Sequence, residues 1–308
     1  MEVFILGSSG SIPTLKRNLP SLVLRRDGKL YMFDCGEGTQ IQIIKSGLSL
    51  AKFEAVFISH LHGDHVTGLP GLLMLLTQAS RQDPLTIFGP AGLRDYLESI
   101  QRTLNFYSEY EIIINEITAE GIIYQEKEFY VETARADHNV FTLAYALVEN
   151  PRPGRFYPDK ALEYGLKPGP IYKKLQEGEA VTLENGRVIR PDMVIGPPRP
   201  GRKFVYATDT RPSRKIARLA YQADLLVHDG MFAEEEVQDA AAKGHSTVIQ
   251  AAEIARTAQV KKLIVSHISS RYTQNQILKE QARTVFPDTS VAYDLMNYEI
   301  PFQEEVDG

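Results

Sequence analysis

Cysteine is almost absent from this chain of 308 residues, because Cys35 is the only one. A single thiol excludes an intrachain disulfide and fits a protein kept in a reducing compartment, so we expect a cytoplasmic location. It also excludes structural zinc sites built from several thiolates. Cys35 follows the apolar run YMFD and is expected to be a core residue. Any metal ion bound by this chain would therefore need nitrogen and oxygen ligands.

Long apolar runs are also missing. The densest apolar stretch, GLPGLLMLL at residues 68–76, is far too short to span a bilayer. The first ten residues, MEVFILGSSG, have a strand-like pattern and lack the cleavable apolar core of a secretory signal. We therefore expect no signal peptide and no membrane association.

An excess of positive charge is the third missing feature. The formal net charge is −5, with 43% apolar and 24% charged residues, which is an ordinary globular composition. This balance argues against a uniformly basic nucleic-acid coat but leaves room for local basic patches. The length is sufficient for one large domain or two modest ones with an ample core.

Short apolar runs bounded by glycine, proline or polar clusters recur along the chain and predict many strands. The expected strands are 2–7, 21–26, 29–34, 55–60, 85–89, 111–117, 128–134, 142–149, 203–209, 225–229, 263–267 and 291–294. Apolar spacing that suits one buried face predicts helices at 39–47, 68–79, 91–104, 213–223, 247–258 and 274–286. Strands interleaved with helices predict an α/β protein whose sheets are covered by helices.

Residues 149–179 depart from this pattern. They hold five prolines and little strand periodicity, and an excursion of this length is usually functional or disordered. Between residues 150 and 174 the net charge is +4, from Arg152, Arg155, Lys160, Lys167, Lys173 and Lys174 against Asp159 and Glu163. We expect a basic, proline-rich arm inserted in a single domain that spans residues 1–308. The tail QEEVDG (303–308) is expected to be disordered.

The segment SHLHGDH at residues 59–65 crowds three of the seven histidines and an aspartate onto the end of one predicted strand. His60 and His62 can point to the same side, as residues two apart do in an extended chain. Gly63 permits a tight turn, after which Asp64 and His65 would face back toward the first pair. The simpler interpretation is a surface cluster or structural core histidines. The density of ligands favours a metal site, with enough donors for two ions.

Three further metal-ligand candidates follow other strand-like runs. His138 comes after VETARAD, Asp209 after FVYAT and His267 after LIVS. In α/β folds, ligand sites gather beyond the carboxyl ends of the strands, so these side chains are expected to meet the SHLHGDH loop. Asp209 is the natural bridge, because a carboxylate has two oxygens and can hold both ions.

With these residues in place, the chain closely resembles the metallo-β-lactamase fold, an αββα sandwich with a dinuclear zinc site. Further segments resemble one family of that fold, ribonuclease Z, whose members are tRNA 3′-processing endonucleases. The H-x-H-x-D-H motif is shared across the superfamily, whereas the segments specific to ribonuclease Z are PTLKRN (13–18), GPIYKKLQEG (169–178) and HST (245–247).

The resemblance implies two zinc ions in each subunit. One would be held by His60, His62, His138 and Asp209, and the other by Asp64, His65, Asp209 and His267. It also implies a homodimer in which the arm of one subunit grips the precursor tRNA that its partner cuts.

The resemblance further implies catalytic roles. Asp64 would accept the proton of the attacking water, and His245 would protonate the leaving 3′-oxygen with Asp229 orienting its ring. The alternative for His245 is a place in the cap of the helix that follows. The family usually has glutamate where this chain has Asp229, which is one methylene shorter, so its reach to His245 is in doubt.

Substrate contacts are expected in two places. Lys16 and Arg17 follow the first strand and are positioned to meet the end of the acceptor stem. In the arm, Gly169, Pro170, Lys173 and Lys174 belong to the family-like segment, and its lysines are expected to contact phosphates without reading sequence.

The leading hypothesis is a zinc-dependent endoribonuclease that removes the 3′ trailer from precursor tRNA and leaves a 3′-hydroxyl on the tRNA. A small-molecule phosphodiesterase or other hydrolase of the same fold is a second hypothesis, disfavoured by the basic arm. A non-catalytic RNA-binding protein is a third, disfavoured because all seven candidate ligands are present.

Overall fold

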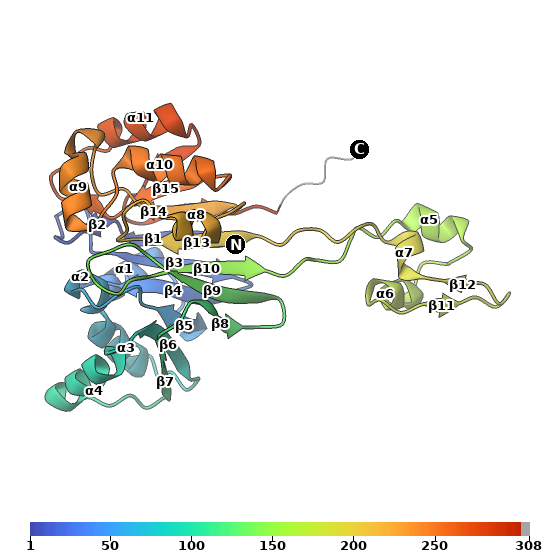
Figure 1. Ribbon diagram of the computed structural model, residues 1–308. Helices are drawn as coiled ribbons and strands as arrows, with labels where there is room; N and C mark the ends of the chain where they lie inside the picture. The colour runs from blue at the N-terminus through green and yellow to red at the C-terminus, as the bar shows by residue number, and fades with distance from the viewer. Residues whose placement is uncertain (303–308) are drawn as a thin grey trace. The chain divides into compact units, whose positions relative to one another are not determined.

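The computed structural model describes residues 1–302, so the disorder expected for QEEVDG lies outside the described residues. These residues form two compact units (Figure 1). The first comprises residues 1–148 and 202–301, and the second comprises residues 149–201 together with Phe302. Within residues 1–302, no helix has the length and apolarity needed to cross a membrane. The SHLHGDH loop and the other metal-ligand candidates belong to the first unit.

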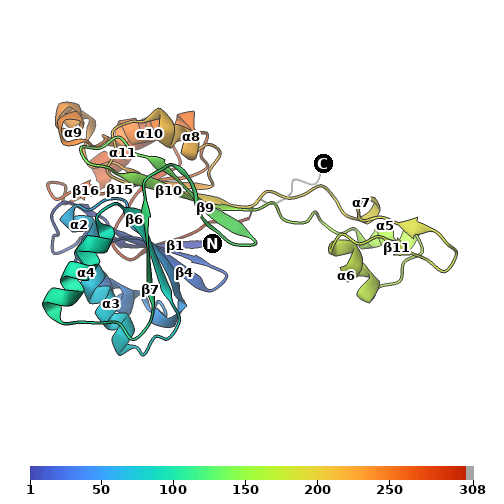
Figure 2. The same cartoon turned by 60° about the horizontal axis from the view of Figure 1, so that its bottom comes forward.

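Two seven-stranded sheets lie face to face in the first unit (Figures 1 and 2). The first sheet has the order β18 (Met296–Glu299), β1 (Glu2–Gly7), β3 (Ser21–Arg26), β4 (Lys29–Cys35), β5 (Phe53–Phe57), β6 (Leu85–Pro90) and β7 (Ile112–Ile117). The second has the order β17 (Thr289–Val291), β15 (Leu263–Ser266), β14 (Leu225–Asp229), β13 (Lys203–Ala207), β10 (Leu143–Glu149), β9 (Phe129–Arg135) and β8 (Gly121–Gln125). A short parallel pair, β2 (Ser9–Gly10) with β16 (Ile268–Ser269), joins the segment after β1 to the segment after β15.

Helices cover the outer face of each sheet. The first sheet packs against α1 (Thr39–Ser46), α3 (Leu69–Gln78) and α4 (Leu93–Leu104). The second packs against α8 (Arg214–Leu219), α10 (Val248–Thr257) and α11 (Gln276–Val285). The first unit also contains α2 (Gly63–Val66) and α9 (Val237–Lys243), with 3-10 turns at Leu50–Lys52 and Glu234–Glu236. The αββα sandwich expected from the sequence is therefore confirmed.

Aromatic side chains fill the space between the sheets. Phe57 stacks on Phe33 and on Phe88, each with ring centroids 5.1 Å apart. The ring of Phe33 also meets the edge of Phe204 from the opposite sheet, at 5.3 Å. Cys35 lies in the outer core of the first sheet, where burial raises the pKa of its thiol, as expected for a core residue. The aromatic contacts hold the two sheets together at the end of β5, where the SHLHGDH loop begins.

Several predicted strands end earlier than their apolar pattern suggests. The strand expected at 55–60 ends at Phe57, because the N–H of Ser59 donates to Asp34 Oδ1 at 2.7 Å instead of joining the sheet. The strand expected at 291–294 was wrong: β17 ends at Val291, and the Asp294 carboxylate turns toward Ser8. Strands β8 and β18 were not predicted.

The second unit has its own small core. It contains α5 (Pro158–Glu163), α6 (Pro170–Gln176), α7 (Pro191–Val194) and a hairpin of β11 (Val181–Thr182) with β12 (Val188–Ile189). Its fully buried side chains are Ala161, Leu166, Leu175, Ile189 and Val194. Ile189 and Val194 lie beyond residue 179, so the boundary expected there falls inside the unit. The hairpin and α7 are needed to bury the apolar face of α5 and α6.

Replacing Phe57 with alanine should destabilise the first unit strongly, because the ring is fully buried and stacked on both sides. We expect the free energy of unfolding to fall by about 3–5 kcal/mol, measured by urea denaturation. Ile122→Ala is the matched control, since Ile122 is 57% exposed and its loss should cost less than about 1 kcal/mol. Equal destabilisation by both substitutions would contradict the packing described.

Candidate active site

The SHLHGDH loop leaves β5 and ends in a single helical turn, α2. His60 and His62 stand in the extended part of the loop, and Asp64 and His65 lie on the turn. Gly63 begins α2, so the backbone changes from extended to helical between the two pairs. The four side chains of the motif are thereby directed to the same edge of the sandwich.

Asp209 and His267 reach this edge from the second sheet. Asp209 follows β13 and His267 follows β15, two strands that run parallel on either side of β14. Both residues have positive φ, 51° and 60°, which is uncommon for residues other than glycine. Strained backbone of this kind clusters at functional sites, where it directs side chains that a regular strand would point elsewhere.

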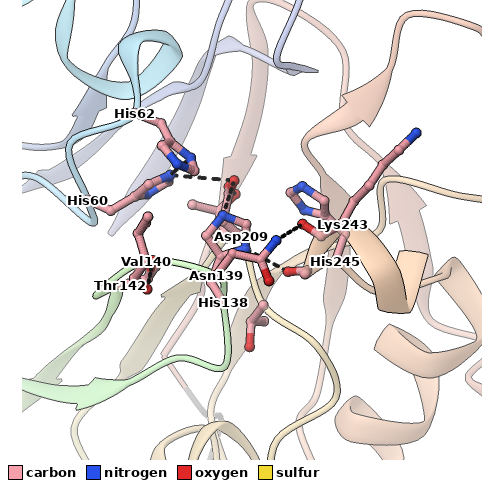
Figure 3. Close-up of polar contacts among 12 residues, drawn as sticks. His60, His62, His138, Asn139, Val140, Thr142, Asp209, Lys243 and His245 are labelled. Atoms are coloured by element: carbon pink, nitrogen blue, oxygen red, sulfur yellow. Dashed lines mark hydrogen bonds and ion pairs between the residues drawn. The ribbon is translucent and has the colours of Figure 1, made fainter. Parts of the chain in front are cut away.

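The structure brings the seven metal-ligand candidates together. His60, His62, His138 and Asp209 form one group and Asp64, His65 and His267 form another, with ligand atoms inside each group within 4.8 Å of one another. Figure 3 shows His60, His62 and His138 converging on Asp209. The first group has the members of one expected ligand set, the second has those of the other without Asp209, and a third group joins Asp209 and His267 with His245.

The two oxygens of Asp209 face different groups. Oδ2 lies 3.7 Å from His60 Nε2 and 3.9 Å from His138 Nε2. Oδ1 lies 3.3 Å from His65 Nε2 and 3.2 Å from His267 Nε2. A carboxylate split in this way is suited to bridge two metal ions.

Each of three histidines is oriented by a hydrogen bond on its second ring nitrogen. His65 Nδ1 contacts Asp34 Oδ2 at 2.7 Å, His138 Nδ1 contacts the Gly244 carbonyl at 2.8 Å, and His60 Nδ1 contacts Ser59 Oγ at 2.9 Å. Partners of this kind orient metal-ligating imidazoles. Asp34 and Gly244 were not recognised from the sequence. The available signal for Asp34 was its place as a charged residue at the end of the apolar run YMFD.

Several imidazole nitrogens that face the centre make no hydrogen bond within the described chain, only ion-pair contacts of 3.2 to 3.9 Å with Asp209 or Asp64. They are buried Nε2 of His65, His138 and His267. Buried polar atoms are rarely left unpaired, so each such atom needs an explanation. A metal ion at the centre of each group would supply it, and nitrogen and carboxylate donors suit zinc. The residues present therefore fit a dinuclear metal site.

Burial and neighbouring charges set the ionisation of the cluster. Burial lowers the pKa of His60 to about 2, and the nearby histidines add to the effect. Burial also acts to raise the pKa of Asp209, but His267, His65 and His60 outweigh it and hold that pKa well below the usual range. At neutral pH the His60 imidazole is therefore neutral, with one ring nitrogen free to act as a ligand, and Asp209 is charged, as ligands must be.

His245 and Asp229 form a second functional pair beside the cluster. His245 Nδ1 contacts Asp229 Oδ2 at 2.7 Å, so the shorter aspartate does reach the ring. Asp229 is fully buried and also accepts the N–H groups of Thr210 and Met231. Burial acts to lower the pKa of His245, but Asp229 outweighs it and raises that pKa to about 9. The imidazole is therefore protonated at neutral pH.

The helix-cap alternative for His245 does not hold. Helix α10 begins at Val248, and its cap is Thr247, whose side chain accepts the N–H of Gln250. The ring of His245 instead stacks on that of His267, with centroids 5.1 Å apart. His245 is thus placed to face the cluster.

The predicted substrate-contact residues differ in exposure. Lys16 is exposed, whereas Arg17 is 7% exposed and its guanidinium donates to Ser8 Oγ and to the Ala292 carbonyl. Arg17 therefore has a structural role that the sequence did not indicate.

The predicted arm contacts lie along α6 in the second unit. Gly169 is the residue before α6, and Pro170 is its first residue. Lys173 and Lys174 are exposed on the same helix. The two lysines are thus accessible to solvent.

The chain is similar over almost its whole length to proteins named ribonuclease Z. It is 44% identical over 306 residues to the protein of Treponema denticola, covering 99% of both chains. It is 43% identical over 300 residues to that of Methanothermobacter thermautotrophicus, covering 97% of both. The family descriptions that match are "Anti-Pycsar protein Apyc1" over residues 1–146 and "Beta-lactamase superfamily domain" over residues 192–268.

Solved structures agree with these similarities. The short form of human tRNase Z superposes with a TM-score of 0.73 at 26% identity, covering 98% of this chain and 100% of that one. The metallo-β-lactamase fold protein YhfI of Bacillus subtilis superposes with a TM-score of 0.66 at 16% identity, covering 96% and 98%. The second likeness shows the shared fold alone.

Substituting Gly244 with alanine should weaken metal binding. Gly244 has a φ of +83°, and a Cβ there would lie 2.6 Å from His138 Nδ1, so the ring must move. We expect the affinity for Zn²⁺ to fall about tenfold to a hundredfold, measured by competition with a chromogenic chelator. Gly28→Ala is the matched control, since its φ is +80° with no atom within 4 Å. Unchanged affinity in Gly244→Ala would show that the Gly244 carbonyl does not orient His138.

Proposed function

Because this chain belongs to the ribonuclease Z family and is a hydrolytic endoribonuclease, we propose that it removes the 3′ trailer from precursor tRNA with two zinc ions. The cut would leave a 3′-hydroxyl on the tRNA. One observation supports this proposal above the others: the two oxygens of Asp209 face two separate histidine groups, beside a protonated histidine–carboxylate pair.

The proposed ligands of one zinc ion are His60, His62, His138 and Asp209, and those of the other are Asp64, His65, Asp209 and His267. Two zinc ions in these positions would supply an acidified water and polarise a phosphate oxygen. Nitrogen and oxygen ligands also tolerate other divalent metals. Zinc is the proposed ion because imidazole ligands suit it.

Asp64 is proposed to orient the attacking water and accept its proton. The Asp64 carboxylate lies within 3.5 Å of Nε2 of both His65 and His267, and it accepts the N–H of Ser11 at 2.9 Å. Burial acts to raise its pKa, but the nearby His267 and His65 outweigh it and hold the pKa below the usual range. A carboxylate of low pKa is a weak base, so the proton would transfer only as the bond to phosphorus forms.

His245 is proposed to protonate the leaving 3′-oxygen. The contact between its Nδ1 and Asp229 leaves Nε2 as the nitrogen that can donate toward the substrate. A pKa of about 9 keeps that proton in place at neutral pH. Asp229 would hold the ring and stabilise its charge, which is the role of a positioned carboxylate in general acid catalysis.

Precursor tRNA is proposed to contact the second unit. The exposed side chains of Lys173 and Lys174 on α6, with Gly169 and Pro170 at its start, are proposed to contact tRNA phosphates. We also propose a homodimer in the cytoplasm, with the second unit of one chain binding the tRNA cut by its partner. Light scattering of the purified protein, alone and with tRNA, would test the dimer.

Cleavage of a 3′-extended precursor tRNA is the direct test of the function. We expect cutting at the 3′ boundary of the tRNA that stops when a chelator removes the metal and returns with Zn²⁺. Asp64→Ala should lower kcat by at least about a hundredfold, because a ligand and a proton acceptor are lost together. Turnover of a chromogenic phosphodiester with no cutting of tRNA would favour the small-molecule hydrolase. Binding without turnover of either substrate would favour the non-catalytic hypothesis.

Substitutions of Asp229 test the proton donor. Asp229→Asn keeps the size but removes the charge that keeps His245 protonated, so we expect kcat for precursor tRNA to fall about a hundredfold or more. Asp229→Glu restores the carboxylate and should recover most of kcat. The metal content of both variants, measured by mass spectrometry, should equal that of the unmodified chain. Normal kcat in Asp229→Asn would exclude the proposed role.

A further inference from the structure

The loop of residues 8–18 rests on the candidate active site but has no core of its own. Residues 11–16 are all exposed to solvent. The Ser11 N–H donates to Asp64 Oδ2 at 2.9 Å, and a Cβ on Gly10 would lie 2.7 Å from His267 Nδ1. The loop therefore touches two candidate metal ligands, and contacts with other segments, including the pairing of Ser9 and Gly10 with β16, hold it there.

A single carboxylate, Asp294, holds both ends of this loop. Its Oδ1 accepts the N–H and the hydroxyl of Ser8, at 3.1 and 2.7 Å. Its Oδ2 accepts the N–H and the side-chain amide of Asn18, at 2.7 and 2.8 Å. Gln42 from α1 donates a fifth bond to Oδ2 at 3.1 Å. Ser8 and Asn18, ten positions apart, are thus joined through one side chain, beside the backbone bond from the Ser9 N–H to the Asn18 carbonyl at 3.0 Å.

Arg17 also holds the loop, and of the two adjacent basic residues it is the one whose side chain points inward. Its guanidinium turns inward to Ser8 Oγ and to the Ala292 carbonyl at 2.9 Å, two residues from Asp294. The adjacent Lys16 is left exposed. Lys16 borders a hollow of about 640 Å³ that is also lined by Lys279 and Tyr293.

We propose that Asp294 is a positioning residue for substrate binding: by closing the loop of residues 8–18, it holds Lys16 where a substrate phosphate passes the candidate active site. This inference rests on the proposed function for the identity of the substrate. Asp294 acts through Lys16 and touches neither the reacting atoms nor the candidate metal ligands. Its removal should therefore weaken substrate binding more than it slows the chemical step.

Asp294→Asn is the substitution that isolates this effect. Asparagine has the same shape as aspartate, but an NH2 group replaces one of the two carboxylate oxygens. Whichever way the amide turns, that NH2 faces the backbone N–H of Ser8 or of Asn18, so one end of the loop loses its acceptor and meets a donor. When the NH2 takes the place of Oδ2, Gln42 loses its acceptor as well.

Limited proteolysis measures how firmly the loop is held, and it does not depend on an assay of activity. Trypsin cuts after Lys16, and release of the peptide Met1–Lys16 from the full-length, zinc-loaded protein can be followed by mass spectrometry. We expect this release to be about tenfold faster in Asp294→Asn, with cuts in the second unit unchanged. Asp224→Asn is the matched control: Asp224 is a buried carboxylate that accepts from Lys203 and Lys261, and it precedes β14 at the end away from Asp229.

Steady-state kinetics with precursor tRNA test the effect on binding. We expect Asp294→Asn to raise KM about tenfold and to leave kcat within about twofold. Lys16→Ala should raise KM to a similar degree. In the double variant the two effects should not add, because both act through Lys16. Additive effects, or a loss of kcat with unchanged KM, would overturn the proposal.

The proteolysis result separates this inference from the proposed function. If the unmodified chain does not cut precursor tRNA, the proposed function fails, and the role of Asp294 in substrate binding fails with it. If the chain does cut precursor tRNA but release of Met1–Lys16 is equal in Asp294→Asn and the unmodified chain, the function stands and Asp294 does not hold the loop.

Discussion

One buried carboxylate, Asp34, connects the two sheets to the loop that carries the candidate ligands. It accepts the N–H of Ser59, the hydroxyl of Tyr206 from the opposite sheet at 2.9 Å, and Nδ1 of His65 at 2.7 Å. A carboxylate removed from water is costly unless hydrogen bonds replace its hydration. The sandwich and the ligand loop are therefore stabilised by the same set of bonds, and neither can shift without leaving Asp34 unsatisfied.

The candidate site depends on this rigidity because its residues come from both sheets. Asp209 and His267 have positive φ at the ends of neighbouring strands, a conformation that costs about 1–3 kcal/mol at each such residue. The packed sandwich beneath them holds that strain in place. The resulting geometry brings four imidazoles within 4 Å of one carboxylate, Asp209, without any long loop. Ligands fixed in advance in this way lose little freedom when a metal binds.

Local patterns in the sequence predicted an element correctly where the spacing of its own apolar residues determines which face is buried. The helix expected at 68–79 is α3 within one residue at each end, because its apolar face is set by its own spacing. Strand β8 was missed because it lies at the edge of its sheet and Ile122 on it is 57% exposed, so no buried alternation marks it. The early end of β5 was missed because the competing acceptor, Asp34, is 25 residues away in the chain.

The sequence by itself determined the fold class and the chemical character of the site. Strand periodicity is local, and the types of ligand and their order along the chain are properties of the residues themselves. Only the tertiary structure decided that Asp34 and Gly244 orient the histidines, that Asp229 reaches His245, and that Arg17 turns inward while Lys16 stays exposed. These outcomes depend on hydrogen bonds between segments far apart in the chain, and no spacing within a short segment encodes such contacts.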